Sequence, residues 1–154
     1  MKDPVSPPLV LSKTAACQAE MKTRIIFPNI EVSQRVKAPQ GALWDLLTDT
    51  TRWAEWGPSV VHVLCSDRRI QKGSRGRVKT ALGLWVPFVI THFEPERYWS
   101  WQVLGIPATG HRVEALAQRL CRLTFEVPLF GAPYIIICRK AIARIAAMLR
   151  DSPP

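Results

Sequence analysis

The carboxyl-terminal stretch APYIIICRKAIARIAAMLR, residues 132–150, decides the fold, because it sustains one periodicity over its whole length. Its apolar residues recur at helical spacing on one face, and its basic residues occupy the other face. The apolar face consists of Ile137, Cys138, Ala141, Ile142, Ile145, Met148 and Leu149, and the basic face of Arg139, Lys140, Arg144 and Arg150. At 1.5 Å per residue, this stretch predicts an amphipathic helix about 28 Å long.

The sequence before this helix predicts strand after strand. Val61, Val63 and Cys65 alternate with His62 and Leu64, which is typical of a half-buried strand. Further strands are predicted over residues 74–81, 84–93 and 98–104, with turns at Lys72-Gly73 and at Glu94-Pro95-Glu96. Gly105, Pro107 and Gly110 indicate an irregular connection after the last of these strands.

Residues 111–127 fit two patterns. Val113, Leu116, Ala117 and Leu120 lie at helical spacing, and the local propensity favours a helix. The residues from Cys121 to Val127 alternate between apolar and polar side chains instead, as a strand does. We favour a hairpin whose turn lies near residues 116–118.

The amino-terminal part supplies a strand and short helices. Ile30, Val32 and Val36 alternate with polar residues, which predicts a strand. Pro39 suits the first turn of a helix over about residues 39–48, and residues 51–56 could add one more turn. Residues 1–25 sustain no periodicity and are expected to form a disordered tail before a single domain over 26–150. This order of elements is that of an α+β protein.

Four segments resemble, in the right order, the START-like (SRPBCC) superfamily of polyketide cyclase/dehydrase and lipid transport proteins. Residues 36–49, VKAPQGALWDLLTD, are similar to the family's opening strand, its Ala-Pro pair and the helix that follows. Residues 53–60, WAEWGPSV, resemble its Trp-x-x-Trp-x-Pro-x-Val segment. Residues 72–76, KGSRG, resemble a glycine-containing turn, and residues 93–101, FEPERYWSW, resemble a later strand connection. The resemblance spans about residues 30–150.

The resemblance implies a helix-grip fold, in which a curved antiparallel sheet wraps around a long carboxyl-terminal helix, with two short helices after the first strand. It also implies an internal cavity for an apolar small molecule. Residues 115–118, ALAQ, depart from the family pattern, which usually has a Gly- or Asp-rich turn before the last strand.

The composition excludes several other classes of protein. Hydrophobic residues make up 47% and charged residues 21% of the 154 residues, which is the balance of a globular domain. No apolar run is long enough for a membrane span, and the first residues lack the apolar core of a signal peptide, so a cytoplasmic protein is expected. The four cysteines form no C-x-x-C pair and have no histidine at metal-ligand spacing, so neither a metal nor a cofactor is expected.

No motif of a nucleophilic, phosphate-binding or zinc enzyme occurs in the chain. His111 is the candidate for chemistry, because alternation puts it on one strand face with Val113 and Ala115. On a concave face its imidazole could orient a bound molecule by one hydrogen bond, or act as a general acid or base. A structural histidine is the simpler interpretation.

The expected cavity wall comprises aromatic residues together with part of the final helix. Its candidate ligand-binding residues are Trp53, Trp56, Trp99, Trp101, His111, Phe125, Ile142 and Ile145. Each of these side chains could equally belong to an ordinary core, which is the more frequent location of tryptophan.

The net charge is +9, and the basic residues are densest across one predicted hairpin. This cluster comprises Arg68, Arg69, Lys72, Arg75, Arg77 and Lys79. Contact with an anionic surface is one interpretation, and a solvated sheet face whose charges prevent edge pairing is the other.

The sequence therefore predicts a protein that binds an apolar small molecule, lipid-like or resembling an aromatic polyketide. Two alternatives remain open. One is a cyclase or dehydratase that uses His111, and the other is a basic adaptor that binds RNA, a ribosome or a membrane surface.

Overall fold

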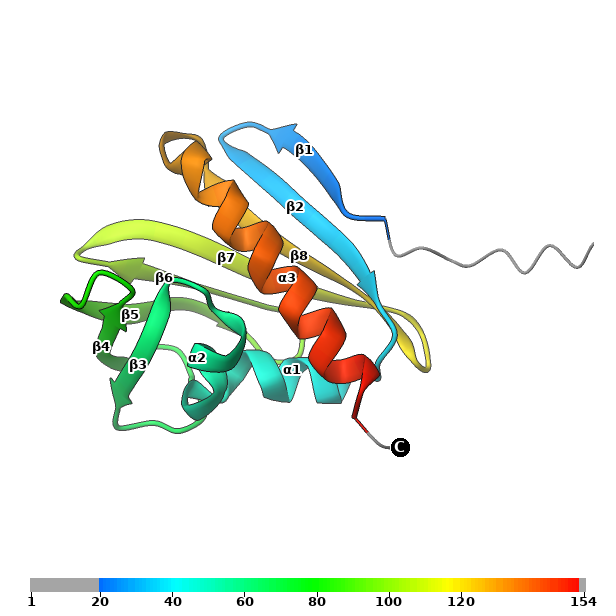
Figure 1. Ribbon diagram of the computed structural model, residues 1–154, viewed down its shortest axis with the longest axis horizontal. Coiled ribbons are helices and arrows are strands. Elements are labelled where there is room, and N and C mark those ends of the chain that lie inside the picture. The colour runs from blue at the N-terminus through cyan, green and yellow to red at the C-terminus, as the bar shows by residue number, and fades with distance from the viewer. Residues whose placement is uncertain (1–19, 153–154) are drawn as a thin grey trace, which may run out of the picture.

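The computed structural model describes residues 20–152 and shows one antiparallel sheet with a long helix across it (Figure 1). The strand order is β1-β2-β8-β7-β6-β5-β4-β3. The strands are β1 (Lys22–Ile26), β2 (Asn29–Val36), β3 (Val60–Cys65), β4 (Arg75–Thr80), β5 (Trp85–Glu94), β6 (Tyr98–Val103), β7 (Ile106–Ala117) and β8 (Leu120–Pro128). Every neighbouring pair is antiparallel.

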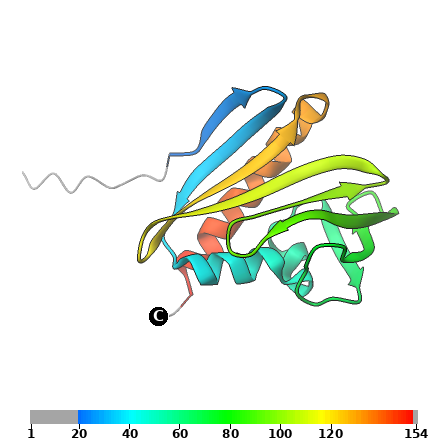
Figure 2. The ribbon, with the colours of Figure 1, turned by 180° about the vertical axis from the view of Figure 1, so that it is seen from behind.

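Short helices follow β2, and the longest helix closes the chain. They are α1 (Gln40–Thr48), the 3-10 turn η1 (Thr50–Arg52), α2 (Trp53–Trp56), the 3-10 segment η2 (Leu129–Tyr134) and α3 (Ile135–Arg150). Figure 2 shows the sheet from its outer side, with α3 behind the strands. The predicted α+β helix-grip fold is confirmed.

The apolar face of α3 lies against the sheet as its periodicity predicts. Cys138, Ala141, Ile142 and Ile145 are buried, whereas Arg139, Lys140 and Arg144 are exposed. The helix starts at Ile135 rather than at Ala132, because Pro133 lies in the 3-10 segment that precedes it.

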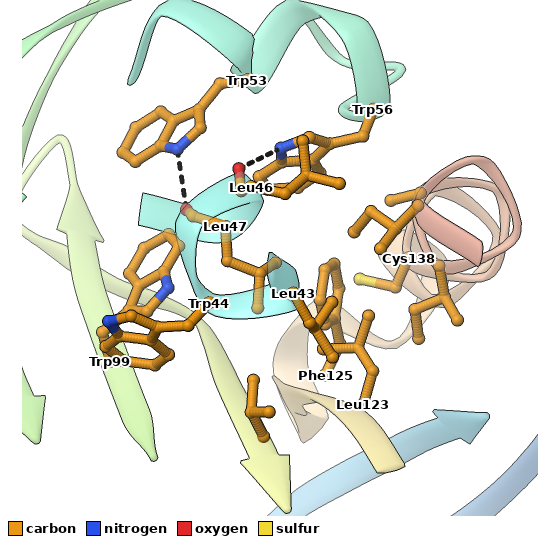
Figure 3. Close-up of a cluster of buried hydrophobic side chains, with 14 of the residues drawn as sticks. Leu43, Trp44, Leu46, Leu47, Trp53, Trp56, Trp99, Leu123, Phe125 and Cys138 are labelled. Atoms are coloured by element: carbon orange, nitrogen blue, oxygen red, sulfur yellow. Dashed lines mark hydrogen bonds between the residues drawn. The ribbon is translucent and has the colours of Figure 1, made fainter. Parts of the chain in front are cut away.

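Two tryptophans fix the short helices to each other. The indole N–H of Trp53 donates to the carbonyl of Leu47 at 2.9 Å, and that of Trp56 donates to the carbonyl of Leu46 at 3.2 Å (Figure 3). Carbonyls in the last turn of a helix have no partner within the helix. The two indoles therefore satisfy the end of α1 and hold α2 beside it, with both rings buried.

Three sequence expectations need correction. Residues 22–25 belong to β1 and not to a tail. All five side chains of β1 are exposed, so its sequence shows no alternation of apolar and polar residues. Its backbone pairing with β2 and a hydrogen bond from Arg139 to Thr23 hold it in place. The first 19 residues of the expected tail lie outside the described part of the chain. Val61 is exposed, because a bulge between Val60 and His62 shifts the alternation of β3.

The third correction concerns residues 105–110, which are strand and not an irregular connection. Leu104 and Gly105, with φ of 55° and 73°, form a tight turn that starts β7 at once. A bulge opposite Trp101 accommodates Pro107. Gly110 has no room for a side chain, since a Cβ there would meet the hydroxyl of Tyr98. The predicted hairpin of β7 and β8 is confirmed, with its turn at residues 118–119.

We expect Ile145→Asp to destabilise the fold by several kcal/mol, because it would place an unpaired carboxylate at a fully buried position of α3. Ala143→Asp, at an exposed position of the same helix, is the matched control and should change the free energy of unfolding by less than about 0.5 kcal/mol. Urea denaturation of both variants measures the difference. Equal unfolding midpoints would show that the buried face of α3 is assigned wrongly.

Candidate ligand-binding cavity

An apolar cavity of about 370 Å³ lies between the sheet and η2, and we call it the outer cavity. Strands β4 to β8 supply inward-facing side chains, among them Val78, Val86, Val103 and Val127. Phe130 and Tyr134 from η2 cover the opposite side. The volume lies within the range of sites for drug-sized molecules.

A much smaller space of about 30 Å³, the inner recess, adjoins the outer cavity. Ser59, Val60, Trp101, Thr109 and Tyr134 line both spaces and so form the boundary between them. The recess has room for about one water molecule. A small molecule of ordinary size must therefore occupy the outer cavity and can reach the recess only with its end.

The structure brings six of the eight predicted wall residues together around the inner recess. These are Trp53, Trp56, Trp99, Trp101, His111 and Phe125. Ile142 and Ile145 line neither space, because they lie further along α3, fully buried in the core. Cys138 and Ala141, about one turn before Ile142 and Ile145 respectively, line the recess instead.

The aromatic residues form a stack that extends from α2 to β7. The rings of Trp53 and Trp99 are parallel to within 1° with centroids 5.4 Å apart, and Trp99 stacks on His111 at 3.8 Å. Phe125 meets the imidazole edge-on at 4.5 Å. Offset and edge-to-face contacts are the favoured aromatic geometries, so these rings stabilise one another in the wall of the recess.

Polar atoms are few in this wall, and two of them have no partner. The indole N–H of Trp101 donates to Thr109 Oγ1 at 3.0 Å, and this oxygen lies 3.3 Å from His111 Nε2. His111 Nδ1 and Trp99 Nε1 are buried without a hydrogen-bond partner among the described residues. Unpaired buried polar groups are costly, so a polar atom of a bound molecule or a water at the recess would be stabilised there.

Burial lowers the pKa of His111 to about 3. The imidazole is therefore neutral at physiological pH and offers one donor and one acceptor nitrogen. A group with so low a pKa is a weak base, so this geometry favours hydrogen bonding over proton abstraction.

Ser59 and Tyr134 are site residues that sequence reasoning missed. Ser59 Oγ and Tyr134 Oη are 2.5 Å apart and link the start of β3 to η2 at the boundary of the two spaces. Burial raises the pKa of Tyr134, which keeps the phenol protonated and able to donate. The two residues are 75 positions apart, so no local pattern could have paired them. Thr109 could have been recognised as a wall residue from the sequence, because it lies two residues before His111 and shares its strand face.

None of the described residues that line the outer cavity carries a charge. Its polar side chains are Ser59, Thr80, Thr109 and Tyr134, all of them neutral. Moving an unpaired charge into such a site is costly. The cavity therefore suits a neutral molecule, or one whose charged end stays outside.

The predicted basic cluster is divided in the structure. Arg68 pairs with Asp49 at 3.0 Å and Arg69 with Asp45 at 2.5 Å, so two of its six members are bonded to the region of α1. Arg75 and Arg77 lie exposed on the outer face of β4. The cluster is thus no single free patch. None of its six members lines either space, although Lys79 lies between Val78 and Thr80, which line the outer cavity.

Within residues 20–152, no group of three or more His, Cys, Asp or Glu side chains is placed to hold a metal ion. None of the helices in that range is both long and apolar enough to span a membrane.

The curved antiparallel sheet and the final helix across it define a helix-grip protein, and this one has an apolar cavity between the sheet and η2. A sequence profile of the family described as polyketide cyclase / dehydrase and lipid transport matches residues 28–147, and the chain belongs to this family. No curated protein sequence matches the chain significantly.

Solved structures share the fold at low sequence identity. The protein XoxI of Bacillus cereus is 11% identical with a TM-score of 0.65, and the match covers 80% of this chain and 96% of that one. Protein Ms6760 of Mycobacterium smegmatis is 17% identical with a TM-score of 0.62, covering 85% and 96%. DynU16, from the dynemicin biosynthetic locus, is 22% identical with a TM-score of 0.59, covering 82% of this chain and 49% of that one.

The low pKa of His111 predicts a pH dependence of stability. As the pH falls from the ordinary histidine value of 6.5 to about 3, the unfolded chain binds a proton at His111 that the folded protein does not. The free energy of unfolding should therefore decrease with falling pH in this window, by about 1.4 kcal/mol per pH unit from this residue. His111→Phe should make that slope shallower in urea denaturation.

Phe125→Leu is the control for this experiment, because it loosens the same aromatic cluster and leaves His111 in place. It should lower the stability at every pH and retain the wild-type slope. If His111→Phe also retains that slope, the imidazole is not buried in its neutral form.

Proposed function

We propose that this protein binds a neutral, mainly apolar small molecule in the outer cavity. The observation that carries the proposal is an apolar space of about 370 Å³ with no charged wall residue, in which the hydroxyls of Ser59, Thr109 and Tyr134 lie at the boundary with the inner recess. A site of this kind recognises its ligand by apolar burial and orients it by a few hydrogen bonds. The family description, which joins polyketide chemistry with lipid transport, supports a ligand of lipid-like or aromatic character.

The affinity would come from the aliphatic wall. Burial of about 300 Å² of apolar ligand surface is worth about 7 kcal/mol at 25 cal/mol per Å², before the entropic cost of association. Val78, Val86, Val103 and Val127 present such surface from neighbouring strands. These contacts do not determine which end of the ligand points toward the inner recess.

The orientation would come from the boundary with the inner recess. Tyr134, Ser59 and Thr109 place their hydroxyls where one end of the ligand arrives. A carbonyl or hydroxyl oxygen at this end could accept from one of them and gain about 0.5–1.5 kcal/mol. We therefore infer a ligand with a single polar end that points toward the aromatic recess.

Filling the outer cavity should abolish this binding. Ala108 lines the cavity on β7, and Ala108→Trp would occupy much of the space with an indole ring. Titration with N-phenylnaphthylamine, a neutral apolar fluorophore, should show at least a tenfold weaker affinity than for the wild type. Native mass spectrometry of the freshly purified wild type would identify any molecule that is already bound.

The matched control is Ala143→Trp, which adds the same side chain at an exposed position of α3. It should bind the fluorophore as the wild type does. Wild-type affinity of Ala108→Trp, in a protein with an unchanged unfolding midpoint, would contradict the assignment of the site to the outer cavity.

A cyclase or dehydratase activity is the second candidate, favoured by the position of His111 beside the cavity. Its Nε2 lies 3.3 Å from Thr109 Oγ1, which itself faces both spaces. A neutral imidazole in this place could donate a proton to, or accept one from, a polar atom of the ligand. The lowered pKa of His111 makes this candidate the weaker one.

His111→Phe separates the two candidates, because it retains an aromatic ring and removes both nitrogens. For a binding protein, the affinity for an apolar ligand should fall about tenfold or less, which is the worth of one neutral hydrogen bond. For an enzyme with His111 as acid or base, turnover should fall about 10²–10⁴-fold. Loss of turnover with unchanged binding, on a substrate found by screening, would establish the enzyme.

A further inference from the structure

The two ends of the sheet differ in chemistry. Because all the strands are antiparallel, five connections lie at one end. One is the passage from α2 into β3, and the other four are the β1–β2, β4–β5 and β6–β7 turns and the passage from β8 into η2. Figure 1 shows the β4–β5 and β6–β7 turns at the left of the molecule, and the β1–β2 turn and the passage into η2 at the top. The backbone N–H of Leu129 donates to the carbonyl of Pro28 at 3.1 Å, which joins η2 to the β1–β2 turn.

Large apolar side chains project into solvent from the three turns and from the passage into η2, and we call them the apolar rim. Their exposed fractions are high: Phe27 84%, Leu82 86%, Leu104 61% and Phe130 71%. Ile106 and Leu84, beside these residues, are also more than half exposed. Single exposed apolar side chains are common on protein surfaces, but here six of them gather at one end of the sheet.

The turn at Leu104 shows that local structure does not demand these residues. Leu104 has a φ of 55° and is followed by Gly105 with a φ of 73°, a conformation in which Asn or Gly is favoured at the first position. A leucine there is locally unfavourable and is also exposed to water. Neither the turn nor the core accounts for it, so contact with something outside the chain is the remaining role.

Cationic side chains lie behind the tips of β1, β4 and α3, and acidic ones behind the tips of β2 and β8. The tip segments 25–28, 80–87, 102–107 and 127–136 contain no charged residue, and the next charges along β1, β4 and α3 are Arg24, Lys79 and Arg139. The acidic side chains of the adjoining strands, Glu31 and Glu126, are both bonded to Arg112. The rim is therefore apolar at its tips, with Arg24, Lys79 and Arg139 behind three of them, and the whole chain has a net charge of +9.

The rim also surrounds the outer cavity. Ile106 and Phe130 belong to both, and Thr80, Pro107 and Pro128 line the cavity directly beside the exposed tips. The tips are separate projections around this space and form no continuous flat patch. Separate apolar projections with cations behind them suit a deformable anionic layer better than a rigid protein surface.

We propose that the apolar rim docks on an anionic lipid bilayer. Phe27, Leu82, Leu104 and Phe130 would insert between the headgroups, while Arg24, Lys79 and Arg139 would lie near the phosphates. In this position the outer cavity faces the membrane, so an apolar molecule could pass between bilayer and cavity with little exposure to water. The docking is a separate property from ligand binding, and either could exist without the other.

Co-sedimentation of the full chain with vesicles tests this proposal. The vesicles consist of phosphatidylcholine alone or of equal parts of phosphatidylcholine and phosphatidylglycerol. The wild type should partition onto the anionic vesicles at low ionic strength, more weakly with added salt, and least onto phosphatidylcholine alone. The double variant Leu82→Ser/Leu104→Asn should partition at least tenfold less onto the anionic vesicles.

This double variant suits the test, because neither leucine lines the cavity and asparagine fits the left-handed turn position. It should fold as the wild type does and bind N-phenylnaphthylamine equally in the absence of vesicles, which keeps this experiment independent of the cavity. The matched control is Leu64→Ser/Leu116→Asn, which removes two exposed leucines toward the opposite end of the sheet and should retain wild-type partition.

Wild-type protein that stays in solution with the anionic vesicles at low salt would overturn the proposal. So would equal losses in the rim and control variants, which would indicate nonspecific adsorption. Sedimentation velocity adds a third outcome: a wild-type dimer that the rim variant dissociates, without vesicle binding, would show that a second copy of the chain covers the rim.

Discussion

The hydrogen bonds from Trp53 and Trp56 to the last carbonyls of α1 are the constraint from which the site follows. A chain that leaves a helix must satisfy those carbonyls, and here two indoles do so from a helix of four residues. Their rings must then lie between α1 and the sheet, where Trp53 meets Trp99 and Trp56 meets Phe125. The hydrogen bonds that satisfy the end of α1 thus also place Trp53 and Trp56 in the wall of the recess.

The remaining aromatic residues and α3 divide the interior into two parts. Toward the end of the sheet opposite the apolar rim, side chains fill the space, and Ile142 and Ile145 are fully buried there. Toward the apolar end, the valines of β4 to β8 leave the outer cavity open. Three of the four hydroxyls of the outer cavity lie at the transition, so burial and hydrogen bonding would act on different ends of the ligand that we propose.

The sequence predicts those parts of the structure in which apolar side chains recur at a regular spacing. The amphipathic face of α3, the strand at Ile30–Val36 and the aromatic wall belong to this group, and six of the eight wall residues do meet at the recess. It does not predict β1, which is held by backbone bonds, nor the effect of bulges on Val61 and Pro107. The link of Ser59 to Tyr134 depends on tertiary placement, which no spacing encodes.

The parallel indoles of Trp53 and Trp99, with the imidazole beneath and Trp101 set edge-on beside them, have a consequence for spectroscopy. Fixed aromatic packing of this kind gives rise to near-ultraviolet circular dichroism. Trp101 borders both the recess and the outer cavity, so a change in either space alters the chiral environment of the whole set. The near-ultraviolet circular dichroism of the protein would therefore follow the binding of the proposed ligand without any added label.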